Sequence, residues 1–140
     1  MNAKVFIDTN ILIYANDKAF PDKQNTCRAR IKEIFKEGNG VISTQILHEF
    51  YVASTRKLNL PPLEVRRQID NLLDFAVIEI DVPLIKEAID CSILDQVSYW
   101  DALVVVCAQK GGCGLLLTED LNHGQIIKGI KIENIFKNRA

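Results

Sequence analysis

Short apolar segments alternate with longer amphipathic ones along most of this chain. Branched and aromatic residues gather in five stretches that predict β-strands: residues 4–7, 41–43, 75–80, 115–117 and 130–135. Between them, apolar residues recur at helical spacing, which predicts helices over residues 22–37, 44–58, 61–73, 82–94 and from 98 to about 110. Strands that alternate with helices indicate an α/β fold whose parallel sheet is covered on both faces.

Composition agrees with one globular domain. The chain has 140 residues, of which 48% are hydrophobic and 25% charged, and these values argue against disorder and against a coiled coil. No repeat or linker-like stretch divides the sequence, so we expect a single domain over residues 1–140. The longest apolar runs fall far short of the roughly 20 residues that cross a bilayer, and Asp8 interrupts the first of them, unlike a signal peptide. We therefore expect a cytoplasmic protein.

The four cysteines give no sign of a zinc site. Cys27, Cys91, Cys107 and Cys113 form no C-x-x-C pair and have no histidine at a ligand spacing. Cys107 lies in an apolar helical run, and we expect it to be a small buried hydrophobic residue.

Four acidic residues occupy positions where the surrounding pattern calls for apolar side chains. Asp8 and Asp120 follow two predicted strands directly, and so lie at the carboxyl edge where open α/β sheets bind ligands. Glu49 falls on the apolar stripe of its predicted helix, and Asp101 shares a face with the valines of the next one.

Each of these acids, taken alone, has a simpler structural explanation. Asp8 is explained as a turn residue, Asp101 as the acid of a capping box that begins at Ser98, Asp120 as another cap, and Glu49 as a partner of Arg56 or Lys57.

Taken together, the four acids favour a metal site. An unpaired carboxylate on an inward face costs several kcal/mol, and four acids at one edge repel one another. A hard divalent cation such as Mg²⁺ or Mn²⁺, which prefers oxygen ligands, removes both costs. Carboxylate clusters that hold such ions hydrolyse phosphodiesters, because the metal activates the attacking water and stabilises the charge on the phosphate and the leaving oxygen.

The segments around these acids resemble the four acidic motifs of PIN-domain ribonucleases, and most closely those of the toxins of VapBC-type toxin–antitoxin pairs. The resemblance runs through Phe6-Ile7-Asp8-Thr9-Asn10, Ile46-Leu47-His48-Glu49-Phe50, Tyr99-Trp100-Asp101-Ala102-Leu103 and Leu117-Thr118-Glu119-Asp120-Leu121. It implies a three-layer α/β/α fold with strand order 3-2-1-4-5 and an acidic pocket at the carboxyl edge of the sheet. It also implies Mg²⁺- or Mn²⁺-dependent cleavage of RNA and, for a toxin, a cognate antitoxin.

The resemblance assigns roles to individual residues. Asp8, Glu49, Asp101 and Asp120 match the acids that bind metal and catalyse. As supporting residues, Asn10 matches the asparagine that supports the first acid, and Thr118 matches the hydroxyl residue two positions before the last acid. Glu119 has the weakest assignment, and we expect it to face solvent.

The remaining polar and aromatic residues carry open alternatives. Trp100 is suited to stacking on a base, but we expect a lone aromatic beside a helix start to be part of the core. We expect His48 and His123 to be structural. Without the four acids the net charge of −1 becomes +3, so basic residues are available to hold RNA phosphates. The apolar positions of residues 22–37 are compatible with a homodimer.

Two other functions compete with a ribonuclease. A phosphoaspartyl enzyme also places Asp at a strand end, but a haloacid-dehalogenase-type phosphatase needs a second Asp where Asn10 stands, and a receiver needs an acidic pair and a later lysine. A catalytically silent module that binds nucleic acid or a partner is the other alternative, and the presence of all four acids argues against it.

Overall fold

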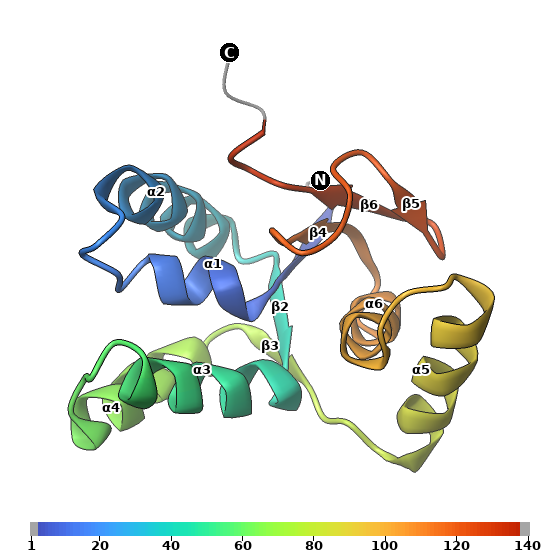
Figure 1. The fold of residues 1–140 in the computed structure, drawn as a ribbon, viewed down its shortest axis with the longest axis horizontal. Coiled ribbons are helices and arrows are strands. Elements are labelled where there is room, and N and C mark those ends of the chain that lie inside the picture. The colour runs from blue at the N-terminus through green and yellow to red at the C-terminus, as the bar shows by residue number, and fades with distance from the viewer. Residues whose placement is uncertain (1–2, 138–140) are drawn as a thin grey trace.

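The computed structural model describes residues 3–137, in which strands and helices alternate as the pattern predicts (Figure 1). β1 (Lys4–Ile7) leads into α1 (Thr9–Tyr14) and α2 (Pro21–Glu37), and β2 (Gly40–Ser43) into α3 (Thr44–Arg56) and α4 (Pro62–Leu72). β3 (Ala76–Ile78) precedes α5 (Val82–Leu94) and α6 (Tyr99–Lys110), and the last strands are β4 (Cys113–Leu117), β5 (Ile126–Ile127) and β6 (Ile130–Glu133).

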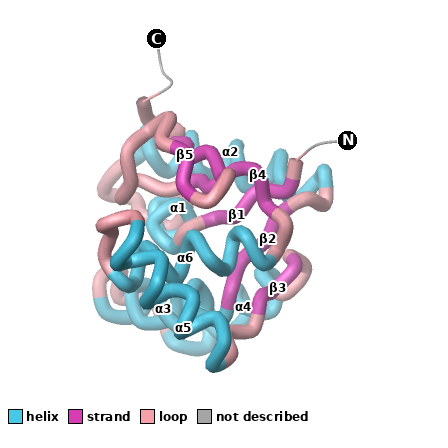
Figure 2. Tube along the Cα trace, turned by 90° about the vertical axis from the view of Figure 1, so that its right-hand side faces the viewer, coloured by secondary structure: helices cyan, strands magenta, loops and turns pink. Residues whose placement is uncertain are grey.

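The sheet is the middle layer of a three-layer structure. Its strand order is β3-β2-β1-β4-β6-β5, and all pairs are parallel except β5 with β6. Figure 1 shows α1 to α4 on one side of the sheet and α5 and α6 on the other, and Figure 2 shows the strands between the helices from a second side. The expected α/β/α class is confirmed, and the five expected strands occur in the expected order.

The sequence did not predict β5, which adds a sixth, antiparallel strand at one edge. Its two residues are too few for a periodic signal, and only Ile127 is buried. The turn to β6 contains Lys128 and Gly129, whose φ values of 52° and 78° are both positive. Two positive φ values at the centre of a two-residue loop are typical of a type I′ hairpin turn, which joins adjacent antiparallel strands.

Side-chain caps set where the helices begin. Ser43 Oγ accepts a hydrogen bond from the backbone N–H of Ile46 at the start of α3, and Ser98 Oγ accepts one from Asp101 at the start of α6. The second bond confirms the capping pattern expected at Ser98. Because β2 ends directly in α3, this helix starts at the carboxyl edge of the sheet.

The core lies on both faces of the sheet. Residues 102–108 of α6 are all buried, because this helix packs between the sheet and α5. All four cysteines are buried and free, as expected for Cys107. Within residues 3–137 no single helix is long and apolar enough to cross a membrane; only α5 and α6 taken as one bent pair reach that length and composition.

Candidate active site

Asp8 is the most enclosed of the four acids. It follows β1, where its backbone N–H donates to the carbonyl of Leu117 in β4 (3.0 Å), and its side chain is 6% exposed. Oδ1 accepts a hydrogen bond from the backbone N–H of Thr9 (2.7 Å), and Oδ2 accepts one from the hydroxyl of Thr118 (2.7 Å). Burial raises the pKa of Asp8 to about 7; the two hydrogen bonds oppose this shift, while the charges of Asp120 and Glu49 add to it.

Asp120 lies beside Asp8 because β1 and β4 are neighbours. The backbone N–H of Asp120 donates to Thr118 Oγ1 (3.1 Å), and Asn10 Nδ2 donates to Asp120 Oδ2 (3.1 Å). Thr118 therefore contacts both acids, and Asn10 ties the start of α1 to the loop after β4. Burial raises the pKa of Asp120, and the charges of Asp101 and Glu119 raise it further.

Glu49 reaches the same place from α3. Its side chain is half-buried, and Oε1 accepts a hydrogen bond from the Thr9 hydroxyl (2.8 Å). Within the described residues it forms no ion pair with Arg56 or Lys57. The structure therefore contradicts the simpler explanation that Glu49 pairs with one of these cations.

Asp101 approaches from the opposite face of the sheet. It lies in the first turn of α6, and its charge contributes to the raised pKa of Asp120. It does not line the cavity into which the other three acids face. The structure thus brings the four predicted acids to one edge, with Asp8 and Asp120 central and Glu49 and Asp101 on either side.

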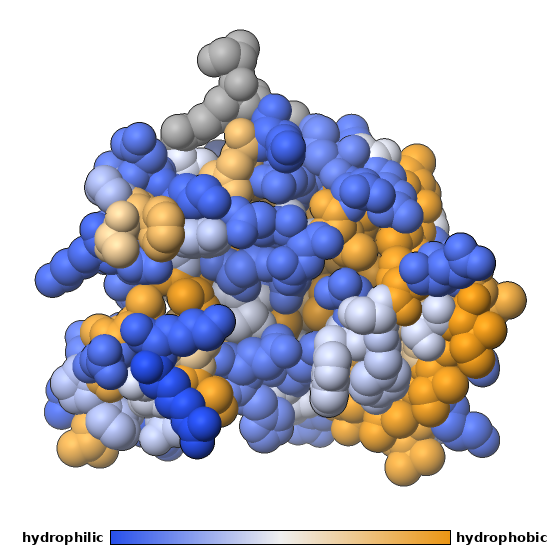
Figure 3. Space-filling view, in the orientation of Figure 1, coloured by the Kyte–Doolittle hydropathy of each residue, from blue (hydrophilic) through white to orange (hydrophobic). Residues whose placement is uncertain are grey.

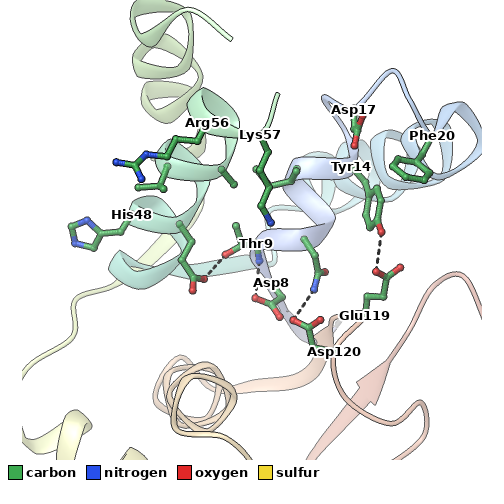
Figure 4. Close-up of a pocket in the computed structure, with 15 residues that line it drawn as sticks. Asp8, Thr9, Tyr14, Asp17, Phe20, His48, Arg56, Lys57, Glu119 and Asp120 are labelled. Carbon is green, nitrogen blue, oxygen red and sulfur yellow. Dashed lines mark hydrogen bonds between the residues drawn. The ribbon is translucent and has the colours of Figure 1, made fainter. Parts of the chain in front are cut away.

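A cavity of about 790 Å³ opens above Asp8, Glu49 and Asp120. Figure 4 shows Asp8 and Asp120 at its base, with Arg56 and Lys57 on the α3 wall. Tyr14, Asp17 and Phe20 form the opposite wall, on the α1 and α2 side. The cavity therefore combines an acidic base with one basic wall and one largely aromatic wall.

The sequence suggested that Glu119 faces solvent, but the structure shows it paired and at the edge of the cavity. Its side chain is 30% exposed and lines the cavity, and Oε2 lies 2.7 Å from Lys23 Nζ. The Tyr14 hydroxyl donates to Oε1 (2.9 Å), and the Lys23 ammonium lies over the rings of Tyr14 and Phe136. Because Glu119 is paired, it is not a free carboxylate in the cavity. No local pattern in the sequence connects Lys23 with a residue so far along the chain.

Trp100 and the histidines have mixed outcomes. The expectation that Trp100 is part of the core is wrong, since 61% of its surface is exposed beside Asp101. His123 is structural as expected, because its Nδ1 accepts a hydrogen bond from the backbone N–H of Asn134 (3.1 Å). His48 is exposed and lines the acidic cavity.

The carboxylates at this edge of the sheet are suitable ligands for a hard divalent ion, although they do not form a closed cluster of metal ligands. Within residues 3–137 no three acidic, cysteine or histidine side chains are close enough to hold a metal ion together. The nearby donors are carboxylates, the kind that Mg²⁺ and Mn²⁺ prefer. The raised pKa values of Asp8 and Asp120 show that negative charge is costly here. Asn10 Oδ1 is also buried without a hydrogen-bond partner among the described residues.

Comparison with known proteins identifies the family. The sequence model of the PIN domain matches residues 5–128, so the chain belongs to the PIN domain family. No curated protein matches the sequence.

Solved structures with a similar fold include toxin–antitoxin proteins. A toxin–antitoxin complex from Klebsiella pneumoniae superposes with a TM-score of 0.71 at 17% identity, covering 94% of this chain and 98% of the other. A DNA-bound VapBC from Salmonella typhimurium gives 0.67 at 20% identity, covering 96% and 99%. VapC20 of Mycobacterium tuberculosis, a toxin that cleaves the sarcin–ricin loop, gives 0.64 at 17% identity, covering 81% and 87%. At these identities the likeness establishes the fold.

Proposed function

We propose that this PIN-domain protein is a Mg²⁺- or Mn²⁺-dependent endoribonuclease that hydrolyses RNA phosphodiester bonds, and that it is the toxin of a type II toxin–antitoxin pair. The observation that carries the proposal is the state of Asp8. This carboxyl group is enclosed by Thr9 and Thr118, and burial together with two neighbouring acids raises its pKa to about 7. A bound divalent cation stabilises the ionised form of such a group.

The four acids receive the catalytic and metal-binding roles. Asp8, Glu49, Asp101 and Asp120 would hold the ion, which when bound activates a water molecule and neutralises charge that develops on the phosphate. Two further side chains support them, as the hydrogen bonds indicate. Asn10 orients Asp120 through its amide, and Thr118 fixes Asp8 through its hydroxyl.

The basic wall of the cavity is suited to the RNA backbone. Arg56 and Lys57 are exposed at the end of α3, line the cavity, and form no ion pair among residues 3–137. Cations that remain unpaired beside acids are available for phosphate oxygens. We assign phosphate contacts to these two residues, which the sequence alone did not distinguish from the other basic residues.

The proposal includes protein partners. VapBC complexes are among the proteins with this fold, which supports a cognate antitoxin. A homodimer is supported by exposed apolar residues on α2 and on α5: Phe35 is 52% exposed, and Val82, Ile89 and Ile93 are 67%, 45% and 69% exposed. Figure 3 shows the hydrophobic side chains gathered over α5. We place the protein in the cytoplasm, as a single domain over residues 1–140, where RNA is available and four free cysteines remain reduced.

Cleavage of a single-stranded RNA by the purified protein tests the proposal. We expect cleavage with Mg²⁺ or Mn²⁺, none with EDTA, and none from the Asp8→Asn variant. Asp22→Asn removes an exposed acid of α2 and serves as the matched control that keeps activity. Metal-independent cleavage, or an active Asp8→Asn protein, would contradict the proposed mechanism.

A catalytically silent binding module is the second candidate, because the described acids do not form a closed metal cluster. Such a module would bind RNA in an anisotropy titration, and in the cleavage assay it would leave the RNA intact with every metal.

A further inference from the structure

A second cavity of about 580 Å³ adjoins the acids on the other side of Glu49. His48 and Glu49 line both this cavity and the acidic one, so the two are continuous along the first half of α3. Its remaining wall is mainly apolar and aromatic, and comes from α6, from α5 and from the segment between β3 and α5: Ile80, Ile85, Tyr99, Trp100 and Leu103.

Trp100 lines this cavity but is not part of the hydrophobic core. It is 61% exposed, and its ring packs edge-on against Tyr99 with the centroids 5.0 Å apart. It directly precedes Asp101, one of the four acids. A large exposed aromatic ring that is held by a second ring, next to a nuclease centre, has the properties of a stacking platform for a base.

Gln45 adds a polar group to the same wall. It is 6% exposed, and its Oε1 is buried without a hydrogen-bond partner among the described residues. Its Nε2 donates only a long bond, 3.4 Å, to the backbone carbonyl of Trp100. Because the terminal amide torsion of Gln is broad, the amide can turn towards a ligand that offers an N–H. An apolar occupant would leave this acceptor unsatisfied.

We propose that this second cavity binds one nucleobase of the RNA, adjacent to the phosphate that is cleaved. The base stacks on Trp100, and a base N–H donates to Gln45 Oε1. The RNA backbone runs from this base past Glu49, which lines both cavities, towards Arg56 and Lys57. This inference rests on the proposed ribonuclease function and adds a base-binding subsite to it.

Trp100 is the only tryptophan of the chain, so its fluorescence reports on the subsite directly. The test uses the Asp8→Asn protein, so that RNA is bound and not cut, with short single-stranded oligoribonucleotides. We expect quenching of Trp100 that saturates together with binding measured by anisotropy. An oligonucleotide of the same length with abasic residues should bind through its phosphates and leave the fluorescence unchanged. Quenching that follows protein concentration instead of RNA would assign the cavity to a second copy and overturn the proposal.

Variants in the same background separate stacking from charge. Trp100→Ala should weaken RNA binding about 5- to 140-fold without changing its salt dependence, and Trp100→Phe should recover part of the loss. Leu63→Ala removes a side chain that is 74% exposed on α4 and should leave binding unchanged. Gln45→Met should retain quenching but equalise the affinities for oligonucleotides of different bases, and unchanged preferences would remove Gln45 from the subsite.

The outcome distinguishes this inference from the proposed function. If the wild-type protein cuts RNA in Mg²⁺ and the Asp8→Asn protein binds it with no response from Trp100, the base subsite is wrong and the ribonuclease assignment stands. If RNA is neither bound nor cut, both fail.

Discussion

The hydroxyl of Thr9 donates a 2.8 Å hydrogen bond to Oε1 of Glu49 and thereby joins the start of α1 to α3 across the acidic cavity. The backbone N–H of the same threonine donates to Asp8 Oδ1. One residue thus fixes the distance and orientation between two acids from different elements. Thr9 is only 9% exposed, so water does not readily replace its hydroxyl.

Thr9→Val should lower turnover and metal affinity more than it lowers RNA affinity. Valine keeps the shape and the backbone bond to Asp8 but leaves Glu49 Oε1 without its donor, so that Glu49 is free to turn away from Asp8. Thr9→Ser restores the hydroxyl and should recover most of the activity. Cleavage kinetics and RNA anisotropy on both variants check this, and equal rates for Val and Ser would show that the hydroxyl has no positioning role.

The free energy of unfolding of the metal-free protein should fall as pH rises from about 4 to 7. In this range the unfolded chain ionises Asp8 near its usual pKa of 3.8, while the folded protein still keeps the proton up to about 7. Below this range Asp8 is protonated in both states, so its ionisation costs the folded protein nothing. Above this range Asp8 is ionised in both states, and the folded protein bears the full free-energy cost of the buried charge. The shift corresponds to about 4 kcal/mol at most.

Asp8→Asn should remove that pH dependence and leave the fold intact. The amide oxygen can still accept from Thr9, and the Thr118 hydroxyl can turn to accept from the new amide N–H. Without metal at pH 8 the variant should therefore be at least as stable as the wild type, and the difference between them should shrink towards pH 4. Urea unfolding at both pH values, in EDTA, measures it. A variant that is less stable than the wild type at pH 8 would show that the Asp8 carboxylate stabilises the fold.

Mg²⁺ or Mn²⁺ should raise the Tm of the wild type and not that of Asp8→Asn/Asp101→Asn. A ligand that binds only the folded state stabilises it by about 2.7 kcal/mol at a concentration 100 times its Kd. The measurements use buffer without Ca²⁺, and the Asp22→Asn variant serves as a control in which none of the four acids is changed. Equal shifts in all three proteins would place the metal elsewhere.

Sequence reasoning predicted which acids lie near this edge of the sheet because the strand ends and the helical stripe are local signals. Asp8 and Asp120 follow apolar strands directly, and the parallel pairing of β1 with β4 then brings them together. Contacts between distant segments carry no such signal: Tyr14 bonds to Glu119, 105 residues away. Trp100 was misplaced for the same reason, since its exposure depends on how α3 and α5 pack around the start of α6. β5 was missed because two residues have no period.

Arg56→Gln/Lys57→Gln should weaken RNA binding and reduce its salt dependence. Each phosphate contact on a single strand contributes about 0.7 to the slope of log K against log salt concentration, so losing two should lower the slope by about 1.4. Arg66→Gln/Arg67→Gln makes the same charge change on α4, away from the cavity, and should alter the slope less. Titrations at several salt concentrations in the Asp8→Asn background measure both. Equal slopes for the two double variants would indicate a general charge effect instead of a basic wall.

Glu49→Gln should bind RNA without cutting it. Glutamine keeps the volume of the side chain, and its amide oxygen can still accept the hydrogen bond from Thr9, so the local structure has little reason to change. What is lost is one full negative charge beside Asp8, where a divalent ion would be held. Metal affinity and turnover should therefore fall together, while RNA affinity stays close to that of the wild type because phosphates contact basic residues. Loss of a charge that repels Asp8 should also lower the pKa of Asp8 towards its usual value.

For Glu49→Gln, RNA anisotropy measures RNA affinity and cleavage in Mg²⁺ measures turnover, with Glu64→Gln on α4 as the matched control. Cleavage near the wild-type rate would exclude Glu49 from the site and leave Asp8, Asp101 and Asp120 to hold the metal.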